Sequence, residues 1–159
     1  MNIEDLVYEE LKKRGFKVST AESCTGGLLS GKIINVSGAS SIIDMAFVTY
    51  SNESKCELLN VNMDSIKKYG VVSEQVAGEM ATNVAKKSKS NVGLSTSGIA
   101  GPTGATDKKP VGMVCFGISI NGRLWTFTHI FENISRSYIR NSSVDFILEK
   151  LLYILKTEF

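Results

Sequence analysis

Segments with the apolar spacing of a strand alternate along this chain with segments that have the spacing of an amphipathic helix. Near the end, two strand-like segments flank Asn121-Gly122, the dipeptide most typical of a tight hairpin. Such an alternation places helices on both faces of a sheet, so we expect a three-layer α/β/α sandwich around a mixed, mostly parallel sheet. The predicted helices are 3–14, 28–34, 52–59, 64–69, 74–89 and 134–155, and the predicted strands are 16–20, 45–50, 92–96, 111–120 and 123–131.

Length and composition are typical of one soluble globular domain that spans residues 1–159. The chain has 159 residues, of which 43% are hydrophobic and 21% charged, close to the average for globular domains. Its 18 basic and 16 acidic residues give a net charge of +2, and the basic residues form only short local clusters. A nucleic-acid-binding surface usually carries a basic stripe, so we expect no nucleic-acid partner.

Cysteine and histidine usage limits the metal chemistry and the compartment. Cys24, Cys56 and Cys115 lack metal-site spacing, and His129 is the single histidine, so no metal site is expected. His129 alternates with apolar residues in a predicted strand, which favours a structural role. An odd number of cysteines and an acidic N-terminus without a signal-peptide core favour the cytoplasm. The longest uncharged stretch, 90–106, is too rich in Gly, Ser and Thr to span a membrane.

The turn after the first predicted strand, residues 20–27, is the first candidate site. Its sequence is Thr-Ala-Glu-Ser-Cys-Thr-Gly-Gly. A serine on a sharp strand-to-helix turn is exposed, and backbone N–H groups beside it can stabilise an oxyanion. This suggests Ser23 as a nucleophile. On the pattern alone, however, an ordinary Ser/Thr-rich helix cap is the more common interpretation.

Tyr50 and Lys55 form the second candidate. Tyr50 ends a predicted strand, and Lys55 lies in the first turn of a helix that Asn52 is expected to cap. The positive end of the helix and partial burial would both lower the pKa of Lys55. A neutral lysine could then activate Ser23 in a Ser–Lys dyad, because no histidine is free for a triad. Taken alone, a solvated lysine and a core tyrosine are the more common interpretation.

A glycine-rich loop, 97–104, and two arginines are candidates for binding an anion. Glycines permit close approach of the backbone to a ligand and can form an anion-binding nest. A flexible surface loop would have the same composition. Arg136 and Arg140 are four residues apart and so share one face of the last helix. There they either clamp a phosphate or carboxylate or are simply solvated.

Five motifs stand out along the chain. They are Thr20–Gly27, Phe47–Asn52 with Lys55, Gly70–Glu74, Ser97–Gly104 and Lys109–Gly112. In their order and spacing they closely resemble the CinA C-terminal-domain family, the nicotinamide-nucleotide amidases, over essentially the whole chain. The chain looks like the stand-alone form, because the molybdopterin-binding-like domain that precedes this one in longer relatives is absent.

The resemblance implies hydrolysis of the carboxamide of nicotinamide mononucleotide to nicotinate mononucleotide and ammonia, a recycling step of bacterial pyridine nucleotides. It also implies an α/β/α sandwich, self-association into a dimer or larger oligomer, and no metal or other cofactor. The family's nucleophile falls on Ser23, its lysine on Lys55 and a supporting tyrosine on Tyr50. A further family serine falls on Ser40, and a family arginine falls on Arg136, with Arg140 on the same face.

Two segments depart from the family pattern. Relatives often have Gly-Asp-Arg where this chain has Ile134-Ser135-Arg136, and Gly-Ser-Ser where it has Gly38-Ala39-Ser40. The arginine and one serine are nevertheless present. The motifs and the resemblance together give the expected substrate-binding residues, which are Thr25, Gly26, Gly27, Ser40, Gly98, Ala100, Gly101, Gly104, Arg136 and Arg140.

In the expected mechanism, neutral Lys55 takes the proton of Ser23, whose oxygen attacks the carboxamide carbon. Backbone N–H groups of the turn from Cys24 to Gly27 hold the oxyanion. Tyr50 orients Lys55 or relays the proton. The loop from Gly98 to Gly104 and an arginine hold the nucleotide phosphate.

Three other functions remain open on the sequence. The same pocket could sense a pyridine nucleotide without turnover, or the chain could be an amidase for another small amide, such as a different nucleotide or free nicotinamide. A competence factor that acts on nucleic acid is suggested only by the family's name, and the nearly neutral charge disfavours it.

Overall fold

The structure, a computed structural model, describes all 159 residues. Its strands are β1 (Val18–Glu22), β2 (Ile43–Val48), β3 (Val92–Gly98), β4 (Met113–Ile120) and β5 (Arg123–Ile130). Its helices are α1 (Ile3–Arg14), α2 (Leu28–Ile33), α3 (Asn52–Leu59), α4 (Met63–Tyr69), α5 (Glu74–Ser88) and α6 (Arg136–Glu158), and Ala39–Ser41 form a 3₁₀ turn. Every helix and strand expected from the sequence is present, with ends that differ by a few residues.

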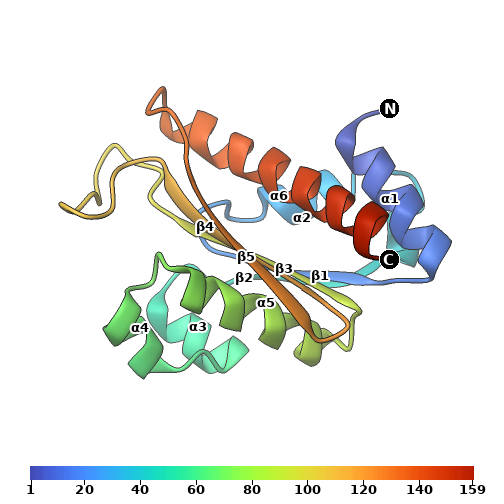
Figure 1. Ribbon diagram of the computed structural model, residues 1–159, viewed down its shortest axis with the longest axis horizontal. Helices are drawn as coiled ribbons and strands as arrows, with labels where there is room; N and C mark the ends of the chain where they lie inside the picture. The colour runs from blue at the N-terminus through green and yellow to red at the C-terminus, as the bar shows by residue number, and fades with distance from the viewer.

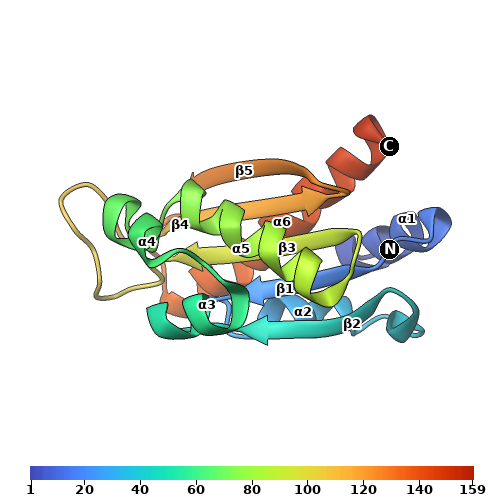
Figure 2. The same cartoon turned by 90° about the horizontal axis from the view of Figure 1, so that it is seen from below.

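The five strands form one sheet in the order β2-β1-β3-β4-β5 (Figure 2). Strand β1 is parallel to both β2 and β3, whereas β4 is antiparallel to β3 and β5 is antiparallel to β4. Four strands therefore run in one direction, which confirms a mixed, mostly parallel sheet. Asn121 and Gly122 join β4 to β5 with φ angles of 48° and 86°, the left-handed backbone that a two-residue hairpin turn requires.

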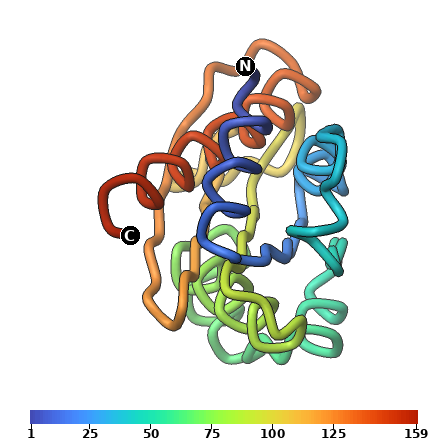
Figure 3. The backbone as a smooth tube through the Cα atoms, turned by 90° about the vertical axis from the view of Figure 1, so that its right-hand side faces the viewer, coloured from blue at the N-terminus to red at the C-terminus, as the bar shows by residue number.

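Helices cover both faces of the sheet, so the expected three-layer α/β/α sandwich is confirmed. Helices α1, α2 and α6 lie on one face, and α3, α4 and α5 lie on the other (Figure 1). Figure 3 shows α1 and α6 side by side. The main core lies beneath this pair and includes Phe116 and Leu148, while a smaller core around Met80 and Val84 lies under α5.

The predicted cap of α3 and the predicted start of α6 were wrong by one and two residues, and a serine side chain explains each. Asn52 is the first residue of α3 rather than its cap, because the Ser51 side chain accepts the N–H of Ser54. Helix α6 begins at Arg136 rather than at residue 134, because the Ser135 side chain accepts the N–H of Tyr138. A side-chain oxygen that takes an unpaired amide of the first turn marks where a helix starts.

Glycines on two strands let α5 lie directly on the sheet. A side chain at Gly117 of β4 would overlap the carbonyl oxygen of Ala77 and approach the Cβ of Ala81 to 2.8 Å. Gly93 of β3 faces the backbone of Ala81 in the same way. The helix layer on this face therefore depends on the absence of side chains at these two positions.

We expect Gly117→Ala to lower the free energy of unfolding by about 1–3 kcal/mol, because the added methyl group overpacks the contact with α5. Urea denaturation followed by circular dichroism measures the change. Gly31→Ala is the matched control, since a Cβ at this helical position has nothing within 4 Å, and it should be neutral or stabilising by up to about 1 kcal/mol. Equal unfolding midpoints for wild type and Gly117→Ala would contradict the close packing.

Candidate functional site

A cavity of about 540 Å³ lies beyond the carboxyl ends of β1 and β3. Ligands of open α/β sheets bind at this end of the strands, and small-molecule sites commonly measure about 300–1,000 Å³. The loop that follows β3 and the first residues of α3 and α6 complete its wall. The predicted site residues that line it are Ser23, Tyr50, Lys55, Gly98, Ala100, Gly101, Gly104 and Arg136.

The charge of this cavity is unbalanced. Its lining includes the cationic side chains of Lys55, Lys109 and Arg136 and no aspartate or glutamate. None of the three forms an ion pair with a carboxylate elsewhere in the chain. A concave surface with uncompensated positive charge attracts anions.

Ser23 follows the last residue of β1 and lines the cavity. The residue is 9% exposed, and its N–H donates to the carbonyl of Thr96 on the neighbouring strand β3. The start of the turn is thus held by the sheet itself, while the hydroxyl faces the cavity.

Lys55 is completely buried, although lysine side chains are rarely found in protein interiors. Its Nζ lies 3.1 Å from the Oγ of Ser23 and donates to the backbone carbonyls of Thr49 at 2.7 Å and Tyr50 at 3.3 Å. Helix α3 starts just after β2, so the first-turn position of Lys55 points the side chain back over the end of the sheet.

Burial lowers the pKa of Lys55 to about 8, because the charged form loses its hydration and no carboxylate replaces it. An amine that has lost one proton keeps two protons and gains a lone pair. The carbonyls of Thr49 and Tyr50 can only accept hydrogen bonds, so the two N–H groups that remain on the neutral amine donate to them. The lone pair is then free to accept the proton of the Ser23 hydroxyl, which is the role of a general base.

The turn after Ser23 leaves two backbone N–H groups without an acceptor in the chain. Of the backbone N–H groups from residue 23 to residue 30, only those of Cys24 and Thr25 lack one. The N–H of Gly26 donates to the carbonyl of Ser23, and that of Gly27 donates to the carboxylate of Glu22. Of Cys24 and Thr25, only Cys24 lines the cavity, since Thr25 is completely buried, so the expected oxyanion-binding turn is reduced to the amide of Cys24.

Cys24 follows Ser23 directly but is a poor alternative nucleophile. Burial raises the pKa of its thiol to about 12, and a thiol becomes strongly nucleophilic only as the thiolate. The hydroxyl beside Lys55 is the group that the surroundings can activate.

Tyr50 contacts Lys55 through its backbone rather than its side chain. The ring is exposed, and its hydroxyl accepts a hydrogen bond from Arg136 at 3.1 Å. Arg136 also donates to the carbonyl of Gly101 at 2.8 Å. Tyr50 and Arg136 therefore join the start of α6 to the glycine-rich loop at the rim of the cavity.

Several predicted site residues lie outside the cavity lining. The buried hydroxyl of Thr25 donates to Glu22, and Arg140 binds the carbonyls of Cys24 and Thr25 from behind the turn. Gly26 and Gly27 shape this turn without lining the cavity.

Ser40 lies at the far end of the sheet from Ser23. It precedes the first residue of β2, whereas Ser23 follows the last residue of β1, and the two strands are parallel. The structure therefore does not bring Ser40 to this cavity within one chain.

Sequence reasoning missed Lys109 as a site residue. Its Nζ donates to the carbonyls of Tyr69 at 2.8 Å and Val72 at 2.6 Å, which ties the long loop after β3 to the connection between α4 and α5. Both segments form walls of the cavity. The available signal was the position of Lys109 in the last of the five motifs.

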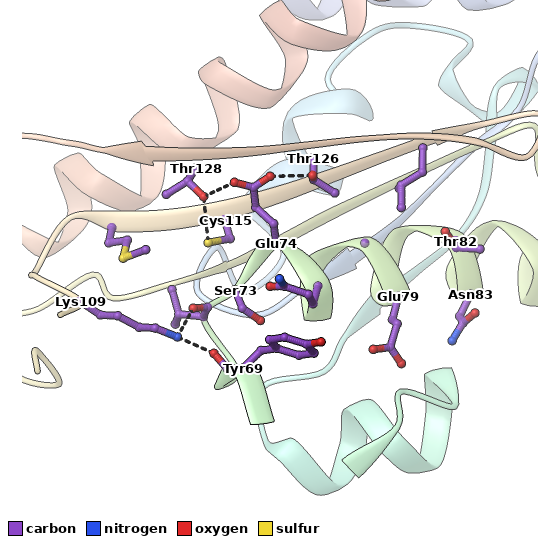
Figure 4. Close-up of a pocket in the computed structure, with 15 residues that line it drawn as sticks. Tyr69, Ser73, Glu74, Glu79, Thr82, Asn83, Lys109, Cys115, Thr126 and Thr128 are labelled. Carbon is purple, nitrogen blue, oxygen red and sulfur yellow. Dashed lines mark hydrogen bonds between the residues drawn. The ribbon is translucent and has the colours of Figure 1, made fainter. Parts of the chain in front are cut away.

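A second, larger groove lies between α5 and the β4–β5 hairpin (Figure 4). Its central carboxylate, Glu74, already accepts hydrogen bonds from Thr126 at 2.6 Å and Thr128 at 2.7 Å. Because these polar groups satisfy one another, the groove offers less for a ligand than the cavity at Ser23.

Other kinds of site have little support in the structure. No three His, Cys, Asp or Glu side chains are grouped closely enough to hold a metal ion. His129 stacks on Phe131 and Phe146 at centroid distances of 4.5 and 4.9 Å. No helix is both long and apolar enough to cross a bilayer.

We expect the stability of this protein to reflect the buried amine of Lys55. Between about pH 8 and the ordinary lysine value of 10.5, the unfolded state binds the proton more tightly, so folding stability contributed by this group rises with pH in that window. Below this pH window, Lys55 is charged in the folded state, and burying this charge costs folding free energy. The difference in free energy of unfolding between Lys55→Met and wild type should therefore change by about 3 kcal/mol in favour of wild type between about pH 7 and about pH 10.5.

Parallel chemical denaturation of wild type and Lys55→Met at several pH values measures this difference. The contributions of the other titrating groups to the pH dependence cancel in this difference, because both proteins contain the same groups. A difference in unfolding free energy that did not change with pH would contradict the lowered pKa.

Sequence comparison connects the chain with longer proteins. The CinA C-terminal domain family matches residues 1–155. A protein of Clostridium botulinum (strain Langeland), provisionally named competence-damage inducible protein, is 45% identical over 155 residues, which are 98% of this chain and 38% of that protein. A protein of Alkaliphilus oremlandii with the same provisional name is 44% identical over 151 residues, 95% of this chain and 36% of that protein. The chain thus spans less than two fifths of the length of these relatives.

Solved structures match nearly the whole chain. The competence/damage inducible protein of Agrobacterium tumefaciens superposes with a TM-score of 0.91 at 36% identity, covering 98% of this chain and 96% of that one. A CinA superfamily protein of Klebsiella pneumoniae superposes with a TM-score of 0.93 at 30% identity, covering 98% and 99%. On both sequence and structure, the chain belongs to the CinA C-terminal domain family.

Proposed function

We propose that this protein hydrolyses the carboxamide of nicotinamide mononucleotide to nicotinate mononucleotide and ammonia. The observation that carries the proposal is the Nζ of Lys55, buried without a carboxylate and 3.1 Å from the hydroxyl of Ser23. A lysine of lowered pKa beside a serine is the arrangement of a Ser–Lys hydrolase. The family resemblance supplies the substrate.

The charge of the cavity supports a nucleotide substrate over a neutral amide. Lys109 and Arg136 carry positive charge at its walls, and no lining residue is acidic. A phosphate matches such a surface. Free nicotinamide carries no anionic group that could pair with either cation.

The first chemical step is transfer of the Ser23 proton to neutral Lys55 as the serine oxygen attacks the carboxamide carbon. A C–O bond forms, and the carbonyl π electrons move onto oxygen. The unpaired N–H group of Cys24, which lines the cavity beside Ser23, then donates to this oxyanion. Donors held in place before the reaction stabilise charge that develops in the transition state.

In the second step the tetrahedral intermediate collapses. Lys55, now charged, gives its proton to the departing amide nitrogen, which leaves as ammonia, and an ester with Ser23 remains. The same amine, neutral again, takes a proton from water as the water oxygen attacks the ester carbonyl. It gives this proton to the Ser23 oxygen as the ester C–O bond breaks, which releases the carboxylate product and restores the serine. The carbonyls of Thr49 and Tyr50 hold the amine throughout.

Ammonia release from nicotinamide mononucleotide by the purified protein tests the reaction. We expect turnover of the nucleotide and a much higher KM for nicotinamide riboside, which lacks the phosphate. Binding of the nucleotide without ammonia release would instead indicate a sensing module. Equal turnover of free nicotinamide would indicate an amidase of different specificity.

We expect Ser23→Ala to lower kcat by at least about 10³-fold, because the nucleophile is lost, while the thermal unfolding temperature stays close to that of wild type. Cys24→Ser is the matched control at the next position and should lose far less activity. If Cys24→Ser were inactive and Ser23→Ala active, the nucleophile would be the thiol and our assignment would be wrong.

The pH profile tests Lys55 as the base. Since only the neutral amine can accept a proton, kcat/KM should rise about tenfold per pH unit below pH 8 and level off above it. Lys55→Arg should lose at least about 10³-fold, because arginine keeps the charge but does not release its proton. A substantially active Lys55→Arg protein would reduce Lys55 to an electrostatic role.

A further inference from the structure

We infer that Glu22 and Arg140 are positioning residues which together hold the turn after Ser23 in the shape that presents the unpaired N–H group of Cys24 to an oxyanion. This inference deepens the proposed function and rests on Ser23 as the nucleophile. It replaces the expectation that Arg140 shares an anionic ligand with Arg136.

Glu22 holds the turn by accepting hydrogen bonds from its donor groups. Its carboxylate is completely buried and forms no ion pair. It accepts hydrogen bonds from the hydroxyl of Thr25 at 2.6 Å and from the backbone N–H groups of Gly27, Leu29 and Ser30 at 3.1, 2.8 and 3.0 Å. Because the N-cap residue of α2 is a glycine without a capping side chain, Glu22 supplies the cap from the preceding strand.

This cap decides which amides stay free. The start of a helix normally offers several unpaired N–H groups to an anionic ligand. Here the carboxylate of Glu22 occupies that place, so an external anion cannot bind there. The donor that remains for a reacting oxygen is the N–H group of Cys24, which lines the cavity directly beside the nucleophile.

Arg140 holds the same turn by donating hydrogen bonds to its carbonyl groups. Its Nε donates to the carbonyl of Cys24 at 2.9 Å, and its Nη2 donates to the carbonyl of Thr25 at 3.2 Å. The carbonyl of one residue and the N–H of the next lie in one peptide plane and point in opposite directions. Holding the Cys24 carbonyl toward α6 therefore directs the Thr25 N–H away from α6.

The neighbouring peptide is held in the same manner. The Ser23 carbonyl accepts the N–H of Gly26 at 3.1 Å, which fixes the plane that carries the Cys24 N–H. A side chain at Gly26 would begin 3.2 Å from Nη2 of Arg140, at a φ of +56°. Glycine at this position lets the guanidinium reach the turn.

Arg136 and Arg140 thus have different tasks although they lie one helical turn apart. Arg136 lines the cavity, whereas Arg140 does not and spends its donors on backbone carbonyls. Removing Arg140 should weaken stabilisation of the tetrahedral state, and removing Arg136 should weaken binding of the anion.

Binding of 3-pyridineboronic acid separates these effects, because a boronic acid forms a tetrahedral adduct with an activated serine and places an oxygen where the oxyanion forms. Nicotinate mononucleotide is the planar, anionic comparison ligand. Both affinities are measured by calorimetry on wild type, Arg140→Met, Glu22→Gln and the matched control Arg136→Met.

We expect Arg140→Met and Glu22→Gln to lose about 10–100-fold in boronate affinity, part of the 10²–10³-fold effect of deleting an oxyanion donor. Their affinity for nicotinate mononucleotide should change less than about threefold, which also shows that the proteins are folded. Arg136→Met should show the reverse pattern. Arg140→Lys should remain impaired, because a lysine cannot reproduce the two-pronged contact.

Boronate affinity equal to wild type in both folded variants would overturn the inference and leave the proposed function intact. So would a parallel loss of both ligands in Arg140→Met and Arg140→Lys, since that pattern marks general loosening of the site. If wild type formed no boronate adduct and Ser23→Ala remained active, the serine nucleophile itself would be wrong, and the inference with it.

Discussion

The burial of the Lys55 amine beside Ser23 is the constraint on which the chemistry of this protein depends. A lysine at the surface would keep its proton and could not act as a base at neutral pH. Here two backbone carbonyls replace water around Nζ without adding negative charge. That environment lowers the pKa to about 8, which places the lysine within reach of its neutral form and gives the hydroxyl a partner.

The turn that carries Ser23 is held by the sheet and by the helix layer that contains α2 and α6. Strand β3 binds the Ser23 N–H through the Thr96 carbonyl, the carboxylate of Glu22 on β1 caps α2, and Arg140 on α6 binds the carbonyls of the turn. Few of the turn's polar groups are left to adjust when a substrate enters. Such preorganisation is what makes backbone amides effective toward developing charge.

Two walls of the cavity are also held in place by side chains that donate hydrogen bonds to backbone carbonyls. All four backbone carbonyls of the connection from residue 69 to residue 72 accept hydrogen bonds from side chains, two of them from Lys109 and one each from Ser73 and Ser97. These donors come from three different segments. The glycine-rich loop after β3 and the connection before α5 are therefore fixed relative to each other, and the positive charge of Lys109 is fixed with them.

The sequence by itself determined the fold and the location of the candidate turn. Strand and helix periods depend on local side-chain spacing, so the order of elements, the Asn121-Gly122 hairpin and the turn at Ser23 could be predicted from neighbouring residues. The residues suggested the pairing of Ser23 with Lys55, but only the family resemblance favoured it over a solvated lysine, because a surface lysine has the same local sequence as a buried one.

Tertiary structure decided which side chains meet. Arg136 and Arg140 share a helix face, yet one reaches the loop at Gly101 and the other reaches the turn at Cys24, because each contact depends on a segment far away in the chain. Ser40 lies at the opposite end of the sheet from Ser23 because parallel strands start at the same end. The role of Glu22 was hidden for the same reason, since only the path of the chain after the turn brings the amides of α2 back onto its carboxylate.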